Sequence, residues 1–199
     1  MELKESQTYK NLARAYAAEC QARTRYEFAE YGFRYNGFEA IAQIIDTIAY
    51  QEFNHARMLY TKIQSADKKL IDNINIEAGF PFKEKWDMEQ NLKILAEDEE
   101  LEAKAYEEFI KVAKDEGFDE IAELFDMIRI VEIAHQKLFL NLYEQFKSKT
   151  LYKKKSEQAW ICPNCGYVHY DKEAWETCPL CQAKQGVCQV IIPEELKCW

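Results

Sequence analysis

Two copies of a Glu-x-x-His sequence, Glu52 with His55 and Glu132 with His135, lie in segments that are otherwise apolar on one helical face. Apolar residues recur there at steps of three and four, and both polar residues of each pair continue that stripe. All four side chains are therefore predicted to face a core. Glutamate is almost never fully buried unless a partner neutralises it. The two pairs predict a buried site that holds either protons or metal ions.

Three more glutamates, Glu19, Glu99 and Glu102, continue the apolar stripes of two other segments. Five carboxylates that face one core repel each other and lose their hydration unless they are protonated or neutralised by cations. Two metal ions would remove this cost, and ligands rich in carboxylate and poor in imidazole favour iron or manganese over zinc. One glutamate from each of two helices, with a Glu-x-x-His pair from each of two others, is the pattern of di-iron bundles. The predicted ligands are Glu19, Glu52, His55, Glu99, Glu102, Glu132 and His135.

The alternative is that these residues bind no metal, because a single Glu-x-x-His pair is common on helices and charged helical residues usually face solvent. Other charged residues already supply solvated faces here, and Glu97, Asp98 and Glu100 are predicted to lie on them. Two such pairs, each 33 residues after a lone glutamate, favour the metal site.

A shift of 80 residues superimposes the two halves of this region without a gap. It aligns both Glu-x-x-His pairs, both lone glutamates, and the glycines Gly37 and Gly117. The region is therefore predicted to be a duplicated helical hairpin with approximate twofold symmetry. Its central site would be built from equivalent residues of both halves.

Two tyrosines and one glutamate lead to finer expectations. Tyr26 and Tyr106 each follow a lone glutamate by seven residues, which places them two turns further along the same face. They either pack in the core or hydrogen-bond to ligating carboxylates and supply protons. Glu102 breaks the symmetry, because its counterpart in the first half is Ala22. We expect Glu102 and His55 to compete for one metal ion.

Few helix breakers interrupt this region, and residues 1–150 contain one proline, Pro81. The periodicity predicts helices over residues 6–31, 38–65, 87–116 and 118–147, with a break at residues 32–37 and a long connection over residues 66–86. Two helical hairpins joined by one long crossover form the ferritin-like type of four-helix bundle. We therefore predict an all-α bundle domain over residues 1–147.

Four cysteines form two Cys-x-x-Cys pairs near the carboxyl terminus, Cys162 with Cys165 and Cys178 with Cys181. Two such turns form a tetrahedral four-thiolate metal site. The spacing does not separate a structural zinc site from an iron site that carries single electrons. The polar residues 148–158 are predicted to be a linker, and residues 159–199 a small metal module. The residues without an assigned role are Cys20, Cys188, Cys198 and His169.

The composition restricts the partners and the compartment. The formal net charge of −9 argues against nucleic-acid binding, because phosphates attract a basic surface. No apolar run approaches the roughly 18 residues of a membrane span, so we expect a soluble cytoplasmic protein without a membrane partner. Seven cysteines are an odd number, and the two pairs fit metal binding in a reducing compartment better than a disulfide framework.

Three features together resemble the rubrerythrin family: ECQAR at residues 19–23, the two Glu-x-x-His pairs, and WICPNCGYVH at residues 160–169. The resemblance covers nearly the whole chain and implies a ferritin-like di-iron bundle followed by a rubredoxin-like iron module of strands and loops. The family's seven di-iron ligands fall on the seven positions above. The chain departs from the family at Cys20, where serine is usual, and after Glu102, where it is one residue shorter and lacks the usual proline.

The resemblance also implies a non-haem di-iron peroxidase that reduces hydrogen peroxide to water in oxidative-stress defence. Its cofactors would be two iron ions in a carboxylate-bridged site and one iron ion in the four-cysteine site, which zinc can also occupy. Electrons would come from rubredoxin or an NAD(P)H reductase. The protein would be a homodimer or larger oligomer whose rubredoxin-like module approaches the partner's di-iron site. The residues expected to take part in catalysis are Glu52, Glu102, Glu132, Tyr26 and Tyr106, with Glu52 and Glu132 bridging the irons.

Two other functions remain open from the sequence. A ferritin-like ferroxidase or iron store would use oxygen as its oxidant, as would an oxygen reductase, but iron storage needs no dedicated electron carrier. A zinc ribbon that binds a partner protein, with the bundle as its scaffold, would need no redox chemistry. The iron and zinc content, and turnover with peroxide or with oxygen, separate these alternatives.

Overall fold

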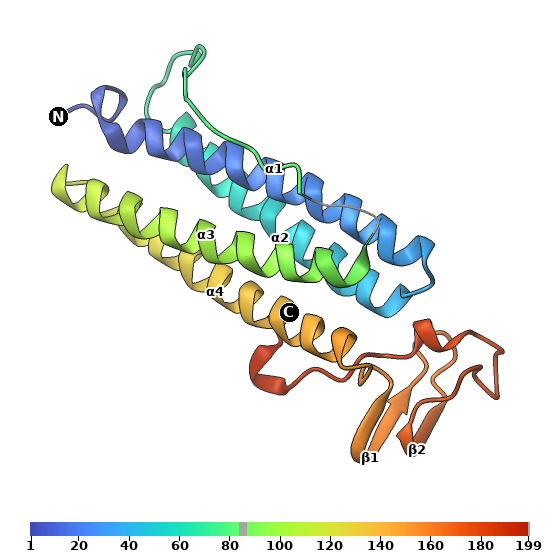
Figure 1. Ribbon diagram of the computed structural model, residues 1–199. Coiled ribbons are helices and arrows are strands. Elements are labelled where there is room, and N and C mark those ends of the chain that lie inside the picture. The colour runs from blue at the N-terminus through green and yellow to red at the C-terminus, as the bar shows by residue number, and fades with distance from the viewer. Residues whose placement is uncertain (84–86, 199) are drawn as a thin grey trace.

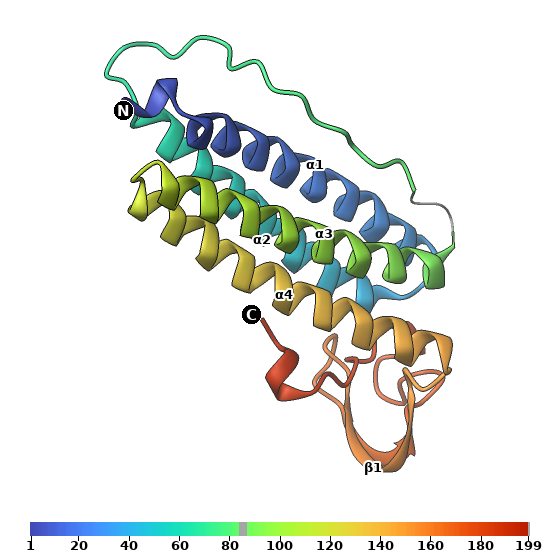
Figure 2. The same cartoon turned by 60° about the vertical axis from the view of Figure 1, so that its left-hand side comes forward.

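Four long helices packed side by side make up most of the computed structural model, which describes residues 1–83 and 87–198 (Figure 1). The helices are α1 (Gln7–Tyr35), α2 (Glu39–Gln64), α3 (Met88–Asp115) and α4 (Asp119–Lys147). Residues 66–83 of the crossover between the two hairpins run along the outside of the bundle beside α1 (Figure 2). The predicted all-α bundle with one long crossover is confirmed. Residues 84–86, at the end of the predicted connection, and residue 199 lie outside the described residues.

The two hairpins turn at equivalent glycines. Gly37 and Gly117 both have a φ of +81°, a left-handed conformation that glycine adopts without steric cost. One residue later, the N–H groups of Phe38 and Phe118 bond back to carbonyls of the last helical turn, at 2.9 and 2.8 Å. Bonds of this kind end helices. The matching helix ends follow the 80-residue repeat of the sequence.

The predicted break over residues 32–37 is wrong in its first part, because α1 continues through Gly32 to Tyr35. A glycine inside a helix costs about 1 kcal/mol relative to alanine. Burial of the next side chain, Phe33, offsets this cost, because that ring lies fully inside the core. The chain reverses only at Gly37, where φ becomes positive.

Two apolar clusters fill the bundle, one on each side of a polar middle. The first includes Ile45 and Leu95, and the second includes Leu59 and Phe125. On every helix the predicted metal ligands lie between residues of the first cluster and residues of the second. The clusters shield the polar middle from water, which makes a carboxylate there costly to ionise. Within the described ranges, no helix is both long enough and apolar enough to cross a membrane.

Strands β1 (Lys153–Ile161) and β2 (Val168–Glu173) form an antiparallel pair beyond the bundle, with Trp160 opposite His169. The indole of Trp160 is fully buried in a small core of its own. The predicted linker over residues 148–158 overlaps β1, and only residues 148–152 connect the strand to α4. A two-stranded ribbon leaves much of its surface in water, so the polar composition of this segment did not indicate a strand.

The chain returns to the bundle after these strands, and residues 190–198, which we call the tail, lie along it (Figures 1 and 2). Val190 and Ile192 are buried in the first apolar cluster. The Gln51 side chain on α2 donates a hydrogen bond to the carbonyl of Cys198 at 2.7 Å. The tail therefore ties the small module to the bundle and reaches the level of the polar middle.

Candidate metal centres

Six of the seven predicted bundle ligands are buried together in the polar middle. They form two overlapping groups of four, and within each group the ligand atoms lie within 4.8 Å of one another. Glu52 and Glu132 belong to both groups. The first group adds Glu19 and His55, and the second adds Glu99 and His135. This arrangement offers two adjacent metal positions with two shared carboxylates.

Each imidazole lies close to three carboxylates, which is more than one ring N–H group can hydrogen-bond. The Nδ1 atom of His55 lies 3.0 Å from a Glu52 oxygen, 3.1 Å from Glu132 and 3.4 Å from Glu19. The Nδ1 atom of His135 has the same surroundings, with Glu52 and Glu132 oxygens at 3.0 Å and a Glu99 oxygen at 3.4 Å. One N–H group cannot donate to three carboxylates. A cation at each position can contact all four ligand atoms.

Carboxylate oxygens without a hydrogen-bond partner also indicate a place for metal ions. In the described part of the chain, one oxygen of each of five glutamates is buried and has no hydrogen-bond partner. A buried carboxylate oxygen without a partner is costly, and a metal ion is the ligand that such oxygens bind best. The donor set therefore fits two divalent or trivalent cations. The five glutamates are Glu19, Glu52, Glu99, Glu102 and Glu132.

Burial and mutual repulsion change the acidity of these groups in the metal-free protein. Burial, and then the nearby Glu132, raise the pKa of Glu19 well above its usual value. Burial raises the pKa of Glu99 to about 8, although the neighbouring His135 opposes this shift. Burial also acts on Glu52, but the imidazoles of His135 and His55 outweigh it and lower the pKa of this carboxyl. Without metal, the site therefore holds protons on its outer carboxyls, and metal ions must displace them.

The two tyrosines connect the halves of the bundle. The hydroxyl of Tyr26 on α1 donates to Glu99 on α3 at 2.7 Å, and the hydroxyl of Tyr106 on α3 donates to Glu19 on α1. Burial, and then these carboxylates, raise the pKa of both phenols, so each hydroxyl keeps its proton and its hydrogen bond. Both rings also pack against phenylalanines of the core. That the hydroxyls supply protons stays a prediction.

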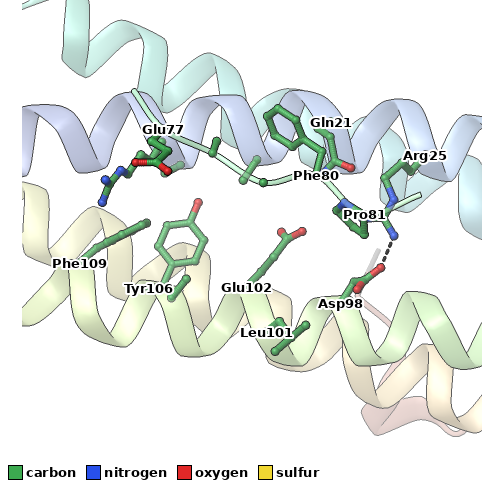
Figure 3. Close-up of a pocket in the computed structure, with 16 residues that line it drawn as sticks. Gln21, Arg25, Glu77, Phe80, Pro81, Asp98, Leu101, Glu102, Tyr106 and Phe109 are labelled. Carbon is green, nitrogen blue, oxygen red and sulfur yellow. Dashed lines mark hydrogen bonds and ion pairs between the residues drawn. The ribbon is translucent and has the colours of Figure 1, made fainter. Parts of the chain in front are cut away.

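Glu102 differs from the other predicted ligands. It is half-buried, and it belongs to neither group of four. Its carboxylate points from α3 into a cavity that Tyr106 also lines (Figure 3). Burial, and then the charge of Glu19, raise its pKa well above the usual value. The carboxylate is close enough to interact with the cluster, while metal binding by Glu102 stays a prediction.

Gln51 is a further residue of the site, outside the seven predicted ligands. Its side-chain oxygen lies 2.7 Å from Nε2 of His135, and its side-chain nitrogen donates to the Cys198 carbonyl at 2.7 Å. Because a carbonyl only accepts, the amide must turn its NH₂ toward the tail and its oxygen toward the imidazole. Nε2 of His135 then carries the proton, and Nδ1 is left to bind metal. The signal in the sequence was a break in the repeat, because the counterpart of Gln51 is Val131.

The prediction that Asp98 is solvated is wrong. Asp98 is buried on α3 and pairs with Arg25 of α1 and, at 3.0 Å, with Lys83 of the crossover. A buried carboxylate needs such cationic partners, and neither of them is near it in the sequence. Glu97 and Glu100 are exposed, as predicted.

The four cysteines of the terminal module form a second cluster. The sulfurs of Cys162 and Cys181 are 3.7 Å apart, as are those of Cys165 and Cys178, and all four thiols are free. A tetrahedral site with metal–sulfur bonds of about 2.3 Å has sulfur–sulfur edges of about 3.8 Å. Burial raises the pKa of Cys178, but backbone N–H groups outweigh it and lower that pKa to about 7. The cluster therefore fits one tetrahedral metal ion.

Known proteins resemble the whole chain. The family model described as rubrerythrin matches residues 10–143, and the model described as the rubredoxin-like domain of rubrerythrin matches residues 160–189. A rubrerythrin of Nitratidesulfovibrio vulgaris (Hildenborough) is 35% identical over 180 residues, which cover 90% of this chain and 91% of that protein.

Two solved structures share the fold of the chain. Fully reduced, all-ferrous nigerythrin has a TM-score of 0.61 at 24% identity and covers 92% of this chain and 86% of its own. A Desulfovibrio desulfuricans bacterioferritin, solved with its di-iron site in different catalytic states, has a TM-score of 0.60 at 23% identity. That match covers 72% of this chain and 82% of the bacterioferritin, so the ferritin-like bundle is the shared part.

Proposed function

The chain belongs to the rubrerythrin family, and from this premise we propose that it is a peroxidase that reduces hydrogen peroxide to water. The family consists of iron-dependent oxidoreductases of oxidative-stress defence, with a carboxylate-bridged di-iron site and a four-cysteine iron site. The proposal rests on the two groups of ligands that share Glu52 and Glu132, in one chain with a four-cysteine site. Two adjacent metal ions suit a two-electron reduction, and a one-electron carrier suits their re-reduction.

We assign the ligands from the two groups. Glu52 and Glu132 would bridge the two ions, because each belongs to both groups. When bound, two ferrous ions supply the two electrons that the reduction of one hydrogen peroxide consumes. The four-cysteine site would hold the third iron ion. The remaining bundle ligands are Glu19 and His55 at one ion and Glu99 and His135 at the other.

The reaction also takes up two protons as the O–O bond breaks and two water molecules form. Glu102 is suited to deliver one, because it lines the cavity beside the ligands and its buried oxygen has no other hydrogen-bond partner among the described residues. Tyr26 and Tyr106 hold hydrogen bonds to Glu99 and Glu19, so their hydroxyls orient the carboxylates beside the reacting centre.

Electrons would reach the bundle through the terminal module. The four cysteines can hold an iron ion that carries one electron at a time. The donor to this ion would be rubredoxin or an NAD(P)H-dependent reductase. We also propose a homodimer or larger assembly, in which the module of one subunit serves the di-iron site of its partner. Within one chain, the carbonyl of Cys198 in the tail accepts a hydrogen bond from the amide nitrogen of Gln51, and the amide oxygen of Gln51 contacts His135.

The test combines metal analysis with turnover. The protein is purified without oxygen, its iron and zinc are counted, and NADH consumption is followed with a suitable reductase and either hydrogen peroxide or oxygen. We expect three iron ions per chain and faster turnover with hydrogen peroxide. Turnover with oxygen alone would instead indicate a ferroxidase or oxygen reductase. Zinc in the four-cysteine site of the active, freshly purified protein would exclude the electron relay.

A further inference from the structure

A cavity of about 530 Å³ lies between α1, α3 and the crossover, beside the di-iron ligands (Figure 3). Most of its wall is apolar. Phe80 of the crossover lies over it, and carbon-rich side chains of both helices line it. The helical residues of that wall include Ala15, Ala18, Leu101, Ala105 and Phe109.

Polar groups converge on the side of the cavity that faces the ligand cluster. Glu102 and Tyr106 line it, and the Tyr106 hydroxyl bonds to Glu19. One buried oxygen of Glu102 and one of Gln21 have no hydrogen-bond partner in the described residues. Both residues line the cavity, so these two oxygens are available for hydrogen bonds with the O–H group of a ligand.

Ion pairs hold the crossover over the cavity. Asp98 on α3 is buried between Arg25 of α1 and Lys83, whose Nζ lies 3.0 Å from the carboxylate. Lys83 follows Pro81, the last of the five crossover residues, 77–81, that line the cavity. The Lys83–Asp98 pair attaches the crossover to α3, and the Arg25–Asp98 pair joins α3 to α1 beside the cavity.

The size and the walls of the cavity do not match hydrogen peroxide alone. A molecule with two heavy atoms needs little space and gains nothing from apolar walls, whereas cavities of about 300–1,000 Å³ with mainly apolar walls bind larger organic ligands. We propose that this cavity binds organic hydroperoxides, with the organic group against the apolar wall and the peroxide group toward Glu102. This inference rests on the proposed peroxidase function.

The reaction balances as it does for hydrogen peroxide. The O–O bond of ROOH would break with uptake of two protons and two electrons, and the oxidation of two ferrous ions to ferric would supply those electrons. One oxygen leaves as the alcohol ROH and the other as water. The alcohol has the same organic group but no O–O bond, so it is an unreactive probe of the cavity.

The test measures binding and turnover in the iron-loaded protein. Equilibrium dialysis against 2-phenylpropan-2-ol reports binding to the oxidised protein, and the ratio of kcat/KM for cumene hydroperoxide to that for hydrogen peroxide reports turnover. Ala105→Phe places a ring inside the cavity, and Phe80→Ala removes an apolar wall at an exposed position, where truncation is expected to cost little stability. Ala159→Phe, on the exposed face of β1, is the control for the first change.

We expect the unmodified protein and the Ala159→Phe control to bind the alcohol. Both cavity variants should bind it at least about tenfold more weakly and lower the kcat/KM ratio by a similar factor, because the filled or opened cavity loses its apolar contacts. Absence of alcohol binding, or equal binding by all variants, would overturn the proposal. So would reduction of hydrogen peroxide without reduction of cumene hydroperoxide. Alcohol binding without turnover of either peroxide would contradict the peroxidase function itself, and with it the role of the cavity.

Discussion

The first hairpin, α1 with α2, and the second hairpin, α3 with α4, supply equivalent ligands, and two of the differences between the hairpins change the surroundings of those ligands. Where the second hairpin has Glu102, the first has Ala22. Where the first hairpin has Gln51 next to its bridging glutamate, the second has Val131. The duplicated hairpins thus create two metal positions, and these two residues, which have no counterpart in the other hairpin, make their surroundings different.

Both differences make the metal position of His135 unlike the metal position of His55. Gln51 fixes the ring of His135 through a hydrogen bond that the tail holds in place. Glu102 is influenced most, after burial, by Glu19, which belongs to the group of His55. The position of His135 is therefore held by a fixed ligand. The position of His55 has an additional carboxylate nearby, and that Glu102 competes with His55 for the metal ion stays a prediction.

Removing a shared ligand should have the largest effect, because it damages both positions at once. We expect Glu52→Ala to lower the iron content from three ions per chain to about one. Peroxidase activity should fall by more than the roughly 10- to 100-fold that changes behind the ligands cause. Glu100→Ala, at an exposed position of α3, is the control and should retain three ions. Two bundle irons in the Glu52→Ala protein would show that this glutamate is not a bridge.

Making the second hairpin resemble the first should have the next largest effect. Glu102→Ala introduces the residue that the first hairpin carries at this position. Because the change removes a proton donor but no member of either group of four, we expect the bundle to keep its two irons while kcat falls by about 100-fold. Steady-state kinetics and iron analysis of the same sample check this. Full turnover with both irons present would rule out a role for Glu102.

Making the first hairpin resemble the second should have a smaller effect. Gln51→Val removes the hydrogen bond to His135, so we expect iron to bind one bundle position about tenfold more weakly. Anaerobic ferrous titration should then show two unequal affinities in the bundle. Gln51→Glu retains an acceptor for Nε2 and serves as the matched comparison. Identical titrations of Gln51→Val and the unmodified protein would mean that the tail and Gln51 do not position the imidazole.

The smallest effect is a pH dependence of stability. In the metal-free protein burial raises the pKa of Glu99 from 4.5 to about 8, and the pKa values of Glu19 and Glu102 also rise. Between these limits the folded state binds more protons than the unfolded state. The free energy of unfolding should therefore fall as pH rises across this window. Thermal unfolding should show a Tm several degrees lower at about pH 8 than at about pH 5.

The iron-loaded protein is the control for this dependence, because metal ions replace the protons on the outer carboxyls. Its Tm should change less across the same window. A metal-free protein that becomes more stable toward pH 8 would have the opposite sign and would mean that the outer carboxyls are ionised without metal.

The bundle and its polar middle could be predicted because they follow from periodicity. Glu19, Glu52 and His135 each interrupt an apolar stripe at the spacing of a helix, and the repeat brings the stripes together. The end of α1 was misplaced, because Gly32 looks like a breaker in the sequence while its neighbour Phe33 is buried. Local propensity yielded there to tertiary packing.

The residues behind the ligands could not be predicted, because their partners are distant in the sequence. Gln51 contacts Cys198 at the far end of the chain, and Asp98 is buried only because Arg25 and Lys83 meet it in space. Strand β1, which begins at Lys153, could not be predicted over its whole length because its first residues are polar. Patterns along one segment indicate which face is buried, but not which segment covers it.

The central claim is that the carboxylates in the middle of the bundle are gathered around two cations. The most direct test is a ferrous titration of the complete protein without oxygen, followed by removal of loosely bound metal and analysis of iron per chain. The account predicts three tightly held ions, two of which are lost in Glu52→Ala. A single ion, retained by the cysteines alone, would contradict it.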